Sequence, residues 1–412
     1  MRLTHLSLTN FRNFARLDMD VPAGPLLLVG DNAQGKTSLL EAIYYSATLE
    51  SFHAQTDRQL INFLAAREPL AVARIVIDYQ RAGSPQLSSG PLISSGAHRL
   101  EIRIIQEPTT NGNSLMRKEM LLDGLKSKSS QVVGQFNAVL FLPQMLRVIE
   151  GAPDDRRRYI NLVLAQGFAG YEEAVSAYGR ALTQRNALLK QLGERGGDAA
   201  QLNFWDEKLA AAGAQLIRAR ILSLQELERL AARLHSELTR GSEILRLAYQ
   251  PSYDPLPPPP GQYSLPIDAR VDRSGFSLEQ IRLGLLASLA HLRNDDIARG
   301  VTTTGPHRDE LRFLSSGIDL GSFGSRGQAR TAMLALKLAE VSWMKARTGE
   351  WPVLLLDEVL VELDTHRRAD LLERLSLCEQ ALLTTTDLNL FAAEFVQKAK
   401  LWNVHAGRVA VA

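Results

Sequence analysis

The sequence contains a single cysteine, Cys378, among 412 residues, and it lacks any apolar run approaching 18 residues. One cysteine excludes a disulfide within the chain and any metal site built from several cysteines. Without a long apolar run, no membrane-spanning helix is predicted, and residues 1–14 lack the apolar core of a signal peptide. These absences fit the reducing cytosol, and we predict a cytoplasmic protein without a membrane segment.

An excess of charge of one sign is also missing. The chain has 47 basic and 45 acidic side chains, which gives a net charge of +2 at pH 7. This small net charge gives no overall positive field that would indicate a nucleic-acid-binding protein, although it does not exclude a local basic face. The aromatic residues, 6% of the chain, form no evident array for stacking bases. The hydrophobic content of 45% is ordinary for a globular protein, and the length predicts two or three domains or one domain with a large insertion.

A glycine-rich loop is the first motif that carries chemistry. Residues 30–37, GDNAQGKT, match G-x-x-x-x-G-K-[ST], the pattern typical of a phosphate-binding loop. The loop follows an apolar run at 26–29, predicted as a buried strand, and precedes a predicted helix at 37–49. Lys36 would reach the β- and γ-phosphates, and the hydroxyl group of Thr37 would ligate Mg²⁺. The alternative is a tight glycine turn with an exposed lysine. The candidate ATP-binding residues are Gly30, Asp31, Asn32, Ala33, Gln34, Gly35, Lys36, Thr37 and Ser38.

Two adjacent carboxylates end a second apolar run. Residues 353–356 are predicted as a strand, and Asp357 and Glu358 follow directly. In a nucleotide hydrolase the first carboxylate would hold Mg²⁺ and the second would polarise the attacking water. The alternative is a strand that surfaces into an acidic turn, but the phosphate-binding loop favours the catalytic interpretation.

A third motif, FGSRGQ at 323–328, precedes a helix predicted to begin near Ala329. Ser325 suits the N-cap of that helix, where hydroxyl and backbone donors can face an anion. A plain serine-capped helix is the alternative, and the position just upstream of the acidic strand argues against it.

The middle of the chain is predicted to be mainly helical, from about 154 to 248, with a further helix near 277–298. A proline-rich connector at 251–266 separates the two segments. Apolar residues recur at coiled-coil spacing, which favours a packed hairpin or bundle over a projecting coiled coil. The seam consists of Ile217, Leu224, Ala231 and Leu238, with Leu227 and Leu234 between them. Residues 71–79 and 99–106 alternate like strands.

These motifs and their order resemble the RecF family, which is related to the heads of SMC and Rad50 proteins. The resemblance runs nearly end to end. The segments that carry it are LTNFRNF (8–14), GDNAQGKTSLLEAIYY (30–45), GAPDDRRRYI (151–160), GPHRDEL (305–311), GSRGQAR (324–330) and LLLDEVLVELD (354–364).

The resemblance implies an α/β fold, an ABC-type ATPase head of the P-loop NTPase class (lobe I) with an inserted, mainly helical lobe II. We therefore expect residues 1–152 and 299–412 to form the two parts of the head and residues 153–298 to form the helical arm.

The resemblance also implies roles for single residues. Ser325, Gly327 and Gln328 would form a signature motif that acts in trans on the γ-phosphate held by a second protomer. Asp357 and Glu358 correspond to the Walker B motif, with Glu358 as the catalytic base, and Asp364 lies in the D-loop. Gln144 occupies the Q-loop position, which makes Thr37, Asp357 and Gln144 the candidate Mg²⁺ ligands. Arg12, Arg156 and Arg157 are candidate DNA contacts. Pairing of Arg156 and Arg157 with Asp154, Asp155 or other acids is an equal alternative, and a structural role is similarly open for Arg12.

Three positions depart from the family pattern. Glu358 stands where the family often has a second aspartate, which makes a more competent base. His53 follows Phe52 where the family usually has an arginine. Residues 383–387 occupy the switch-histidine region of ABC proteins and contain no histidine.

The function implied is that of a DNA-binding ATPase in recombinational repair and replication-fork maintenance. ATP and Mg²⁺ would drive a homodimer onto gapped or double-stranded DNA at single-strand/double-strand junctions, and slow hydrolysis would release it. The implied partners are RecR, with RecO and the recombinase RecA downstream. The alternatives are a transporter-type ATPase subunit, an ATPase coupled to a nuclease, and a nucleotide-dependent scaffold without autonomous DNA binding. The first would need a compact head with a switch histidine, and the second a further acidic domain, neither of which the sequence offers.

Overall fold

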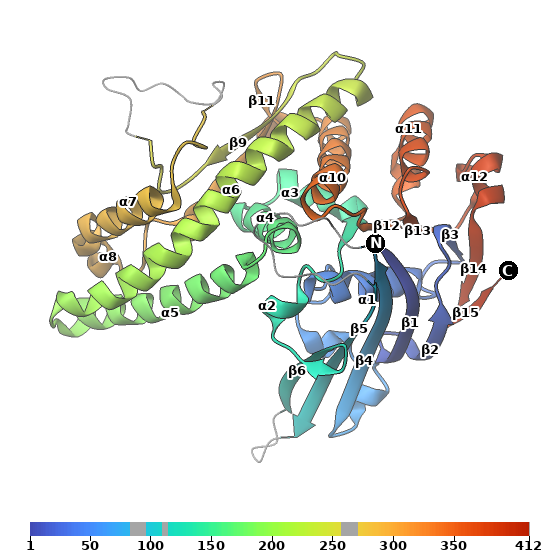
Figure 1. Ribbon diagram of the computed structural model, residues 1–412, viewed down its shortest axis with the longest axis horizontal. Helices are drawn as coiled ribbons and strands as arrows, with labels where there is room; N and C mark the ends of the chain where they lie inside the picture. The colour runs from blue at the N-terminus through green and yellow to red at the C-terminus, as the bar shows by residue number, and fades with distance from the viewer. Residues whose placement is uncertain (83–95, 109–113, 257–270, 412) are drawn as a thin grey trace. The chain divides into compact units, whose positions relative to one another are not determined.

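The computed structural model describes residues 1–82, 96–108, 114–256 and 271–411, which form two compact units (Figure 1). The first unit joins residues 1–145 to residues 340–412, and the second comprises residues 146–339. The sequence-based division, 1–152, 153–298 and 299–412, differs chiefly at the second boundary. Residues 299–339 belong to the second unit because strand β10 within them pairs with β9 of the helical segment.

A mainly parallel sheet of six strands, in the order β15-β14-β3-β13-β12-β8, forms one layer of the first unit. Its strands are β3 (Gly24–Val29), β8 (Ala138–Phe141), β12 (Val353–Asp357), β13 (Gln380–Thr385), β14 (Lys400–His405) and β15 (Arg408–Val411). The central strands β12 and β13 are buried along their whole length and contain the apolar runs 353–356 and 381–383, as is typical of a parallel sheet covered on both faces. The strands predicted at 26–29 and 353–356 are thereby confirmed.

An antiparallel sheet, in the order β2-β1-β4-β5-β6-β7, forms the other layer. Its strands are β1 (Arg2–Phe11), β2 (Phe14–Asp20), β4 (Ala71–Arg81), β5 (Gly96–Pro108), β6 (Ser114–Leu122) and β7 (Leu125–Lys126). Ala73, Ile75, Ile77 and Tyr79 of β4 are buried and share one core-facing side, as the alternation in the sequence indicates, although Val76 on the other side is buried as well. Helix α1 (Lys36–Thr48) contacts strands of both sheets. This position explains why apolar residues occupy nearly its whole circumference.

Helices dominate the second unit, as predicted. They are α3 (Arg147–Glu150), α4 (Pro153–Gly167), α5 (Tyr171–Arg195), α6 (Leu202–Leu238), α7 (Leu278–His291), α8 (Arg293–Arg299), α9 (Leu320–Phe323) and the first part of α10 (Arg326–Thr348). Three strands, β9 (Leu245–Gln250), β10 (Glu310–Ser315) and β11 (Ile318–Asp319), pair antiparallel. The expectation that helix continues to residue 248 is wrong, since β9 begins at Leu245 and pairs with β10 along its whole length.

The shorter helices complete the chain. They are α2 (Ser129–Val132), α11 (Thr365–Leu375) and α12 (Ala393–Lys398) in the first unit, and the single-turn 3-10 helices η1 (Asp57–Leu60), η2 (Ala65–Arg67), η3 (Pro143–Leu146), η4 (Ala199–Gln201), η5 (Pro306–Arg308), η6 (Val359–Glu362) and η7 (Leu388–Leu390). In the part of the chain that the structure describes, no helix combines the length and hydropathy needed to cross a membrane.

The apolar seam of α6 is buried along its length. The helix contacts α5, α7 and β9, so the seam belongs to a packed bundle, the interpretation that the sequence favoured. The connector at 251–266 lies outside the described residues from 257 onward, and residues 251–256 are neither helix nor strand.

A buried charge cluster fastens α5, α6 and α8 together. The guanidinium group of Arg185 is fully buried and donates to Asp206 at 2.6 Å, to Asp296 at 2.7 Å and to the hydroxyl of Thr302 at 2.8 Å. Arg293 donates to the second carboxylate oxygen of Asp206 at 2.7 Å. Buried charges of this kind are tolerated only while each partner remains in place.

We expect Arg185→Ala to lower the free energy of unfolding by about 3–5 kcal/mol, because it leaves two buried carboxylates without their shared cation. Urea titration followed by circular dichroism of the helices measures the change. The matched control is Arg233→Ala. Its pair with Glu237 is a solvent-exposed i,i+4 pair on α6, and its loss should cost less than about 0.5 kcal/mol. Equal effects of the two substitutions would contradict this account of the cluster.

Candidate functional site

The phosphate-binding loop lies between the end of β3 and the start of α1. Gly35 caps α1 with a φ of 119°, and a Cβ atom there would lie 2.5 Å from the side-chain nitrogen of Asn13. A side chain at this position is thus excluded by conformation and by space. Gly30 has a different reason to be glycine, since a Cβ atom would lie 2.2 Å from the carbonyl oxygen of Val404.

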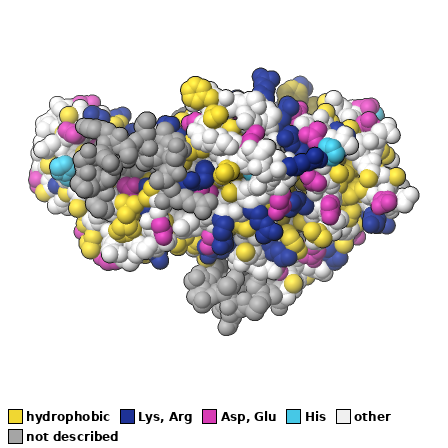
Figure 2. All heavy atoms as spheres, turned by 90° about the horizontal axis from the view of Figure 1, so that it is seen from above, with side chains coloured by type: hydrophobic (Ala, Val, Ile, Leu, Met, Phe, Trp, Pro, Cys, Tyr) yellow, Lys and Arg dark blue, Asp and Glu magenta, His cyan; other side chains and the backbone are white. Residues whose placement is uncertain are grey.

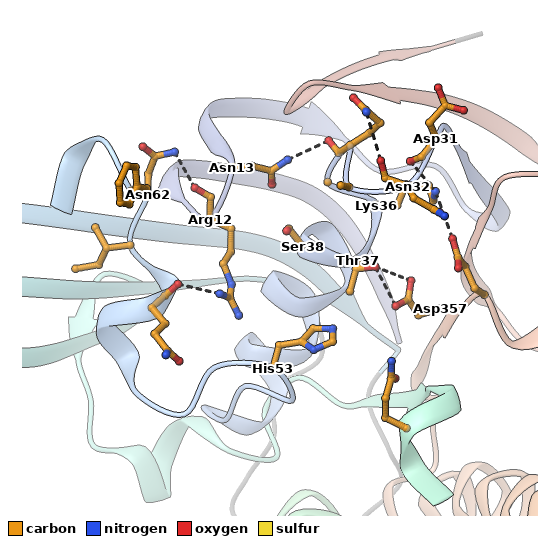
Figure 3. A pocket seen from close by; sticks show the side chains of 18 of the residues that line it. Arg12, Asn13, Asp31, Asn32, Lys36, Thr37, Ser38, His53, Asn62 and Asp357 are labelled. Carbon is orange, nitrogen blue, oxygen red and sulfur yellow. Dashed lines mark hydrogen bonds and ion pairs between the residues drawn. The ribbon is translucent and has the colours of Figure 1, made fainter. Parts of the chain in front are cut away.

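Lys36 is buried within its own loop (Figure 3). Its Nζ donates to the carbonyl oxygens of Gly30 at 2.6 Å and Asp31 at 3.0 Å, and it lies 3.4 Å from Oε1 of Glu358. Only 4% of the lysine side chain is exposed, so these contacts compensate for the loss of water. An anionic ligand in the loop would offer the ammonium group a stronger partner than the half-exposed Glu358 carboxylate.

Asp357 is held by two threonine hydroxyls from different parts of the chain. Thr37 donates to its carboxylate oxygens, at 3.0 and 2.9 Å, and Thr384 donates to Oδ1 at 2.7 Å. Burial raises the pKa of the Asp357 carboxyl, an effect that the hydrogen bonds from Thr384 and Thr37 oppose and the neighbouring Glu358 reinforces. A carboxylate and a hydroxyl that meet in this way are suitable ligands for Mg²⁺, which prefers oxygen.

Glu358 follows Asp357 in a backbone conformation that residues with a side chain rarely adopt. Its φ is 51°, and its backbone N–H donates to Oγ1 of Thr384 at 2.9 Å. Left-handed backbone at a non-glycine residue is typical of functional sites, where the surroundings hold the strain. The turn directs the carboxylate toward Lys36 and the same cavity as Asp357.

Two turns from distant parts of the chain hold the apex of the loop. The carbonyl oxygen of Gln34 accepts from Nδ2 of Asn13 and from the backbone N–H of Gly407, both at 3.0 Å. Its side-chain oxygen accepts from the backbone N–H of Ala406 at 2.7 Å. Gly407 belongs to the turn between β14 and β15, and a Cβ atom there would lie 2.4 Å from the carbonyl oxygen of Asn13. This arrangement, here called the loop clamp, fixes the conformation of the phosphate-binding loop.

A cavity of about 660 Å³ joins these residues, which is large enough for a nucleotide. Its lining is Arg12, Asn13, Asp31, Asn32, Ala33, Gln34, Gly35, Lys36, Thr37, Ser38, His53, Gln59, Ile61, Asn62, Phe63, Leu64, Gln144, Asp357 and Glu358. All these residues belong to the first unit. Eight of the nine candidate ATP-binding residues line the cavity, and Gly30 contributes its carbonyl group to Lys36.

The remaining candidates occupy other places. Gln144 lines the cavity, and its assignment as the Q-loop residue stays a prediction. Asp364 caps α11, and its side chain accepts from the N–H of Arg367 at 3.0 Å. Ser325, Gly327 and Gln328 lie at the start of α10 in the second unit, where Ser325 and Gly327 are exposed. The helix begins at Arg326, three residues earlier than predicted.

The three arginines proposed as DNA contacts all make internal ion pairs or hydrogen bonds. Arg156 forms a two-pronged pair with Glu310, at 2.6 and 2.9 Å, and Arg157 binds Asp154 at 2.5 Å and a backbone carbonyl at 2.7 Å. Arg12 lies at the cavity and pairs with Glu41 at 2.7 Å. The structural alternative for Arg156 and Arg157 therefore accounts for their positions, and a DNA contact at any of the three stays a prediction.

Two residues of the GPHRD segment have structural partners as well. His307 accepts from Tyr178 at Nδ1 and donates to the Thr302 carbonyl at Nε2, and its burial lowers its pKa to about 4. Asp309 accepts from Arg220 at 2.6 Å. Among the described residues no group of three or more histidine, cysteine, aspartate or glutamate side chains could hold a metal ion.

Sequence reasoning missed several contributors. The segment containing Thr384 was noted only for its missing histidine, yet this threonine binds both Asp357 and the backbone of Glu358. The signal that could have identified Thr384 is the parallel pairing of β12 with β13, which places Thr384 opposite Asp357. Asn13 and Asn62 were also missed, because turn asparagines carry no motif that identifies a binding site.

Comparisons with known proteins agree with this geometry. The family model for the RecF/RecN/SMC N-terminal domain matches residues 2–405. The protein of Roseiflexus castenholzii described as DNA replication and repair protein RecF is 39% identical over 423 residues, with 99% of each chain covered. Its counterpart in Chloroflexus aurantiacus is 38% identical over 419 residues, again covering 99% of each chain.

Solved structures give the same result. The structure of the recombination mediator protein RecF with ATP, from the RecFOR pathway, is similar with a TM-score of 0.80 and 28% identity, covering 100% of this chain and 97% of the other. An SMC head bound to the C-winged helix domain of ScpA, 14% identical with a TM-score of 0.50, shares the fold. The predicted fold class, an α/β ABC-type ATPase head, is therefore confirmed.

We expect Asp357→Asn to raise the stability of the protein without ligand, by about 1 kcal/mol, because it removes a buried charge while keeping an oxygen for both threonines. The raised pKa of the wild-type carboxyl means that its ionised form destabilises the folded state. The gain should therefore be present at neutral pH and vanish as the pH falls through that pKa. Thermal unfolding of both proteins measures it. The variant should gain nothing from added Mg²⁺ and ATP, and destabilisation at neutral pH would contradict the interpretation.

We expect Gly407→Ala to weaken nucleotide binding about tenfold or more, since the new methyl group would push the β14–β15 turn away from the loop clamp. Fluorescence titration with a labelled ATP analogue measures the affinity. Gly124→Ala is the matched control, because Gly124 also has a positive φ, of 81°, but open space around its Cβ position. Equal affinities of the two variants would show that the clamp does not support the loop.

Proposed function

The chain belongs to the RecF family, and from this premise we propose that it is an ATP-dependent DNA-binding protein of recombinational repair and replication-fork maintenance. In this proposal, ATP and Mg²⁺ close two copies of the chain over gapped or double-stranded DNA at single-strand/double-strand junctions. Slow hydrolysis then releases the DNA. The protein works in the cytoplasm with RecR, and with RecO and RecA downstream. The observation that carries the proposal is the convergence of Lys36, Thr37, Asp357 and Glu358 on one cavity.

Each of these side chains has a defined task. Lys36 leaves Glu358 and binds the β- and γ-phosphates, while the backbone N–H groups of the loop and the start of α1 face the same anion. Thr37 and Asp357 hold Mg²⁺, and Gln144 lies at the same cavity to contact the ion or its water. Bound Mg²⁺ neutralises charge on the phosphates. Glu358, released from Lys36, is free to polarise the attacking water.

The signature residues supply the argument for a dimer. Ser325 and Gly327 are exposed at the start of the 23-residue helix α10, in the second unit. A helix N-terminus with exposed donors binds anions, yet the cavity that would hold the γ-phosphate is lined by the first unit alone. We propose that these residues act on the nucleotide of a second copy, which gives two equivalent composite sites under two-fold symmetry. ATP then acts as a ligand that favours the closed dimer.

DNA binding is supported mainly by the family. The relatives are described as DNA replication and repair proteins, and a similar structure is a recombination mediator. On the face shown in Figure 2, basic side chains are interspersed with acidic ones. Closure of two copies would bring basic side chains of both together, which would make DNA binding depend on ATP. A nucleotide-dependent scaffold without autonomous DNA binding is the alternative.

We expect Glu358→Gln to bind ATP, to hydrolyse it at least about 100-fold more slowly than wild type, and to accumulate as a dimer. Light scattering with and without Mg²⁺ and ATP measures the dimer. Fluorescence anisotropy with gapped, blunt-duplex and single-stranded DNA, at one stated salt concentration, measures binding. The ATP-dependent signal should be strongest for gapped and duplex DNA.

Two controls accompany this variant. Lys36→Ala should neither dimerise nor bind DNA in response to ATP, and Glu394→Gln, a change at an exposed acid on α12, should behave like wild type. A Glu358→Gln dimer that ignores all three DNA substrates would overturn the clamp and favour the scaffold. A monomer that retains bound ATP would overturn the composite site.

A further inference from the structure

A carboxylate in the second unit links three elements at the base of the signature turn. Glu243 lies in the short segment between α6 and β9. Its Oε1 accepts from Nε2 of Gln328 at 3.3 Å, and its Oε2 accepts from the hydroxyl of Ser315 at 2.6 Å. Nε2 of His235, a fully buried residue in the last turn of α6, lies 3.8 Å from the same Oε2. Glu243 thus touches the end of α6, the end of β10 and the start of α10.

The contact with Gln328 has a specific consequence for the signature turn. The amide oxygen of Gln328 accepts from the backbone N–H of Ser325 at 3.0 Å, while the backbone N–H of Gln328 donates to Oγ of Ser325 at 3.2 Å. This reciprocal pair is a capping box. It requires the amide oxygen of Gln328 to face Ser325 and the amide nitrogen to face away.

Glu243 selects that orientation of the amide. A carboxylate only accepts hydrogen bonds, so it attracts the NH₂ group of Gln328 and repels the oxygen. Because Oγ of Ser325 accepts from Gln328, its own proton remains available for an anion. The exposed donors of Ser325 and Gly327 are therefore ordered before any ligand arrives, which lowers the cost of binding.

From this geometry we propose that Glu243 is a positioning residue that orders the signature turn. By ordering the turn, it sets the affinity of the turn for the γ-phosphate of ATP bound to a second copy of this chain. The same carboxylate makes the turn sensitive to movement at the end of α6 and of β10. The inference rests on the proposed function, because it concerns the composite site of the dimer. It assigns the role to a residue outside every motif that the sequence displays.

The experiment compares Glu243→Ala and Glu243→Gln with wild type. Glutamine can keep an oxygen toward Gln328 while its NH₂ group donates to Ser315, so it should restore much of the function that alanine loses. We expect Glu243→Ala to weaken ATP-dependent dimerisation about tenfold, the size of effect typical of one lost hydrogen bond to a charged group. Binding of a labelled ATP analogue by the single chain should be unchanged, since the cavity belongs to the first unit.

Glu279→Ala is the control. Glu279 is another glutamate of the second unit, and its ion pair with Arg282 at 2.6 Å lies within α7. This variant should dimerise like wild type. Gln328→Ala provides a double-mutant cycle, in which Glu243→Ala should add little once Gln328 is gone.

A mixing experiment separates positioning in trans from simple loss of structure. Glu243→Ala retains its own Lys36, and Lys36→Ala retains its own signature turn, so a mixed dimer contains one complete composite site. ATP hydrolysis by the mixture should exceed the sum of the two separate proteins severalfold. No gain on mixing, or a Glu243→Ala variant that dimerises like wild type, would overturn the inference alone. A wild-type protein that stays monomeric with ATP would overturn the proposed function and the inference together.

Discussion

The first unit depends on one contact, in which the hydroxyl group of Thr37 meets the buried carboxylate of Asp357. The two residues come from opposite ends of the chain, and the contact requires β3, β13 and β12 to lie side by side in one parallel register. That register also places Thr384 beside the carboxylate, where its hydroxyl group donates to Oδ1 of Asp357 and accepts from the backbone N–H of Glu358. Without a ligand, the ionised Asp357 carboxylate lowers the stability of the folded state, as its raised pKa indicates. A site of this kind lowers the stability of the protein without ligand, and binding of a cation and an anion would compensate for that loss.

In the second unit, buried interactions also hold distant segments together. There they are ion pairs between charged side chains from different parts of the chain. Arg185 ties α5 to α6 and α8 through two aspartates, and Arg220 ties α6 to the GPHRD segment through Asp309. Such networks specify geometry more than they add stability. Glu243 contacts the signature turn at the start of α10 and the ends of α6 and β10, and in our proposal it orders that turn. In the proposed cycle, a preordered signature turn allows one bound nucleotide to hold two copies of the chain together.

The sequence predicted those parts of the site that depend on local pattern. The phosphate-binding loop and the acidic strand end were identified because each couples a short apolar strand to residues of fixed chemistry, and the structure brings both to one cavity. The sequence could not predict how strands and turns that are distant along the chain align with one another. Thr384, and the loop clamp made by Asn13 and Gly407, are recognisable only when distant turns and strands are aligned. Strand β9 was mistaken for helix for a related reason. Its residues have no strong local preference, and pairing with β10 decides their conformation.

The central claim is that one copy of the chain binds the nucleotide and the signature turn of a second copy completes the site. The most direct measurement is the rate of ATP hydrolysis per chain across a dilution series that spans the monomer–dimer equilibrium, with light scattering on the same samples. If the signature turn acts in trans, the rate per chain should rise with protein concentration and reach a plateau where the dimer predominates. A rate per chain that is the same in samples that light scattering shows to be monomeric and in samples that it shows to be dimeric would contradict the account.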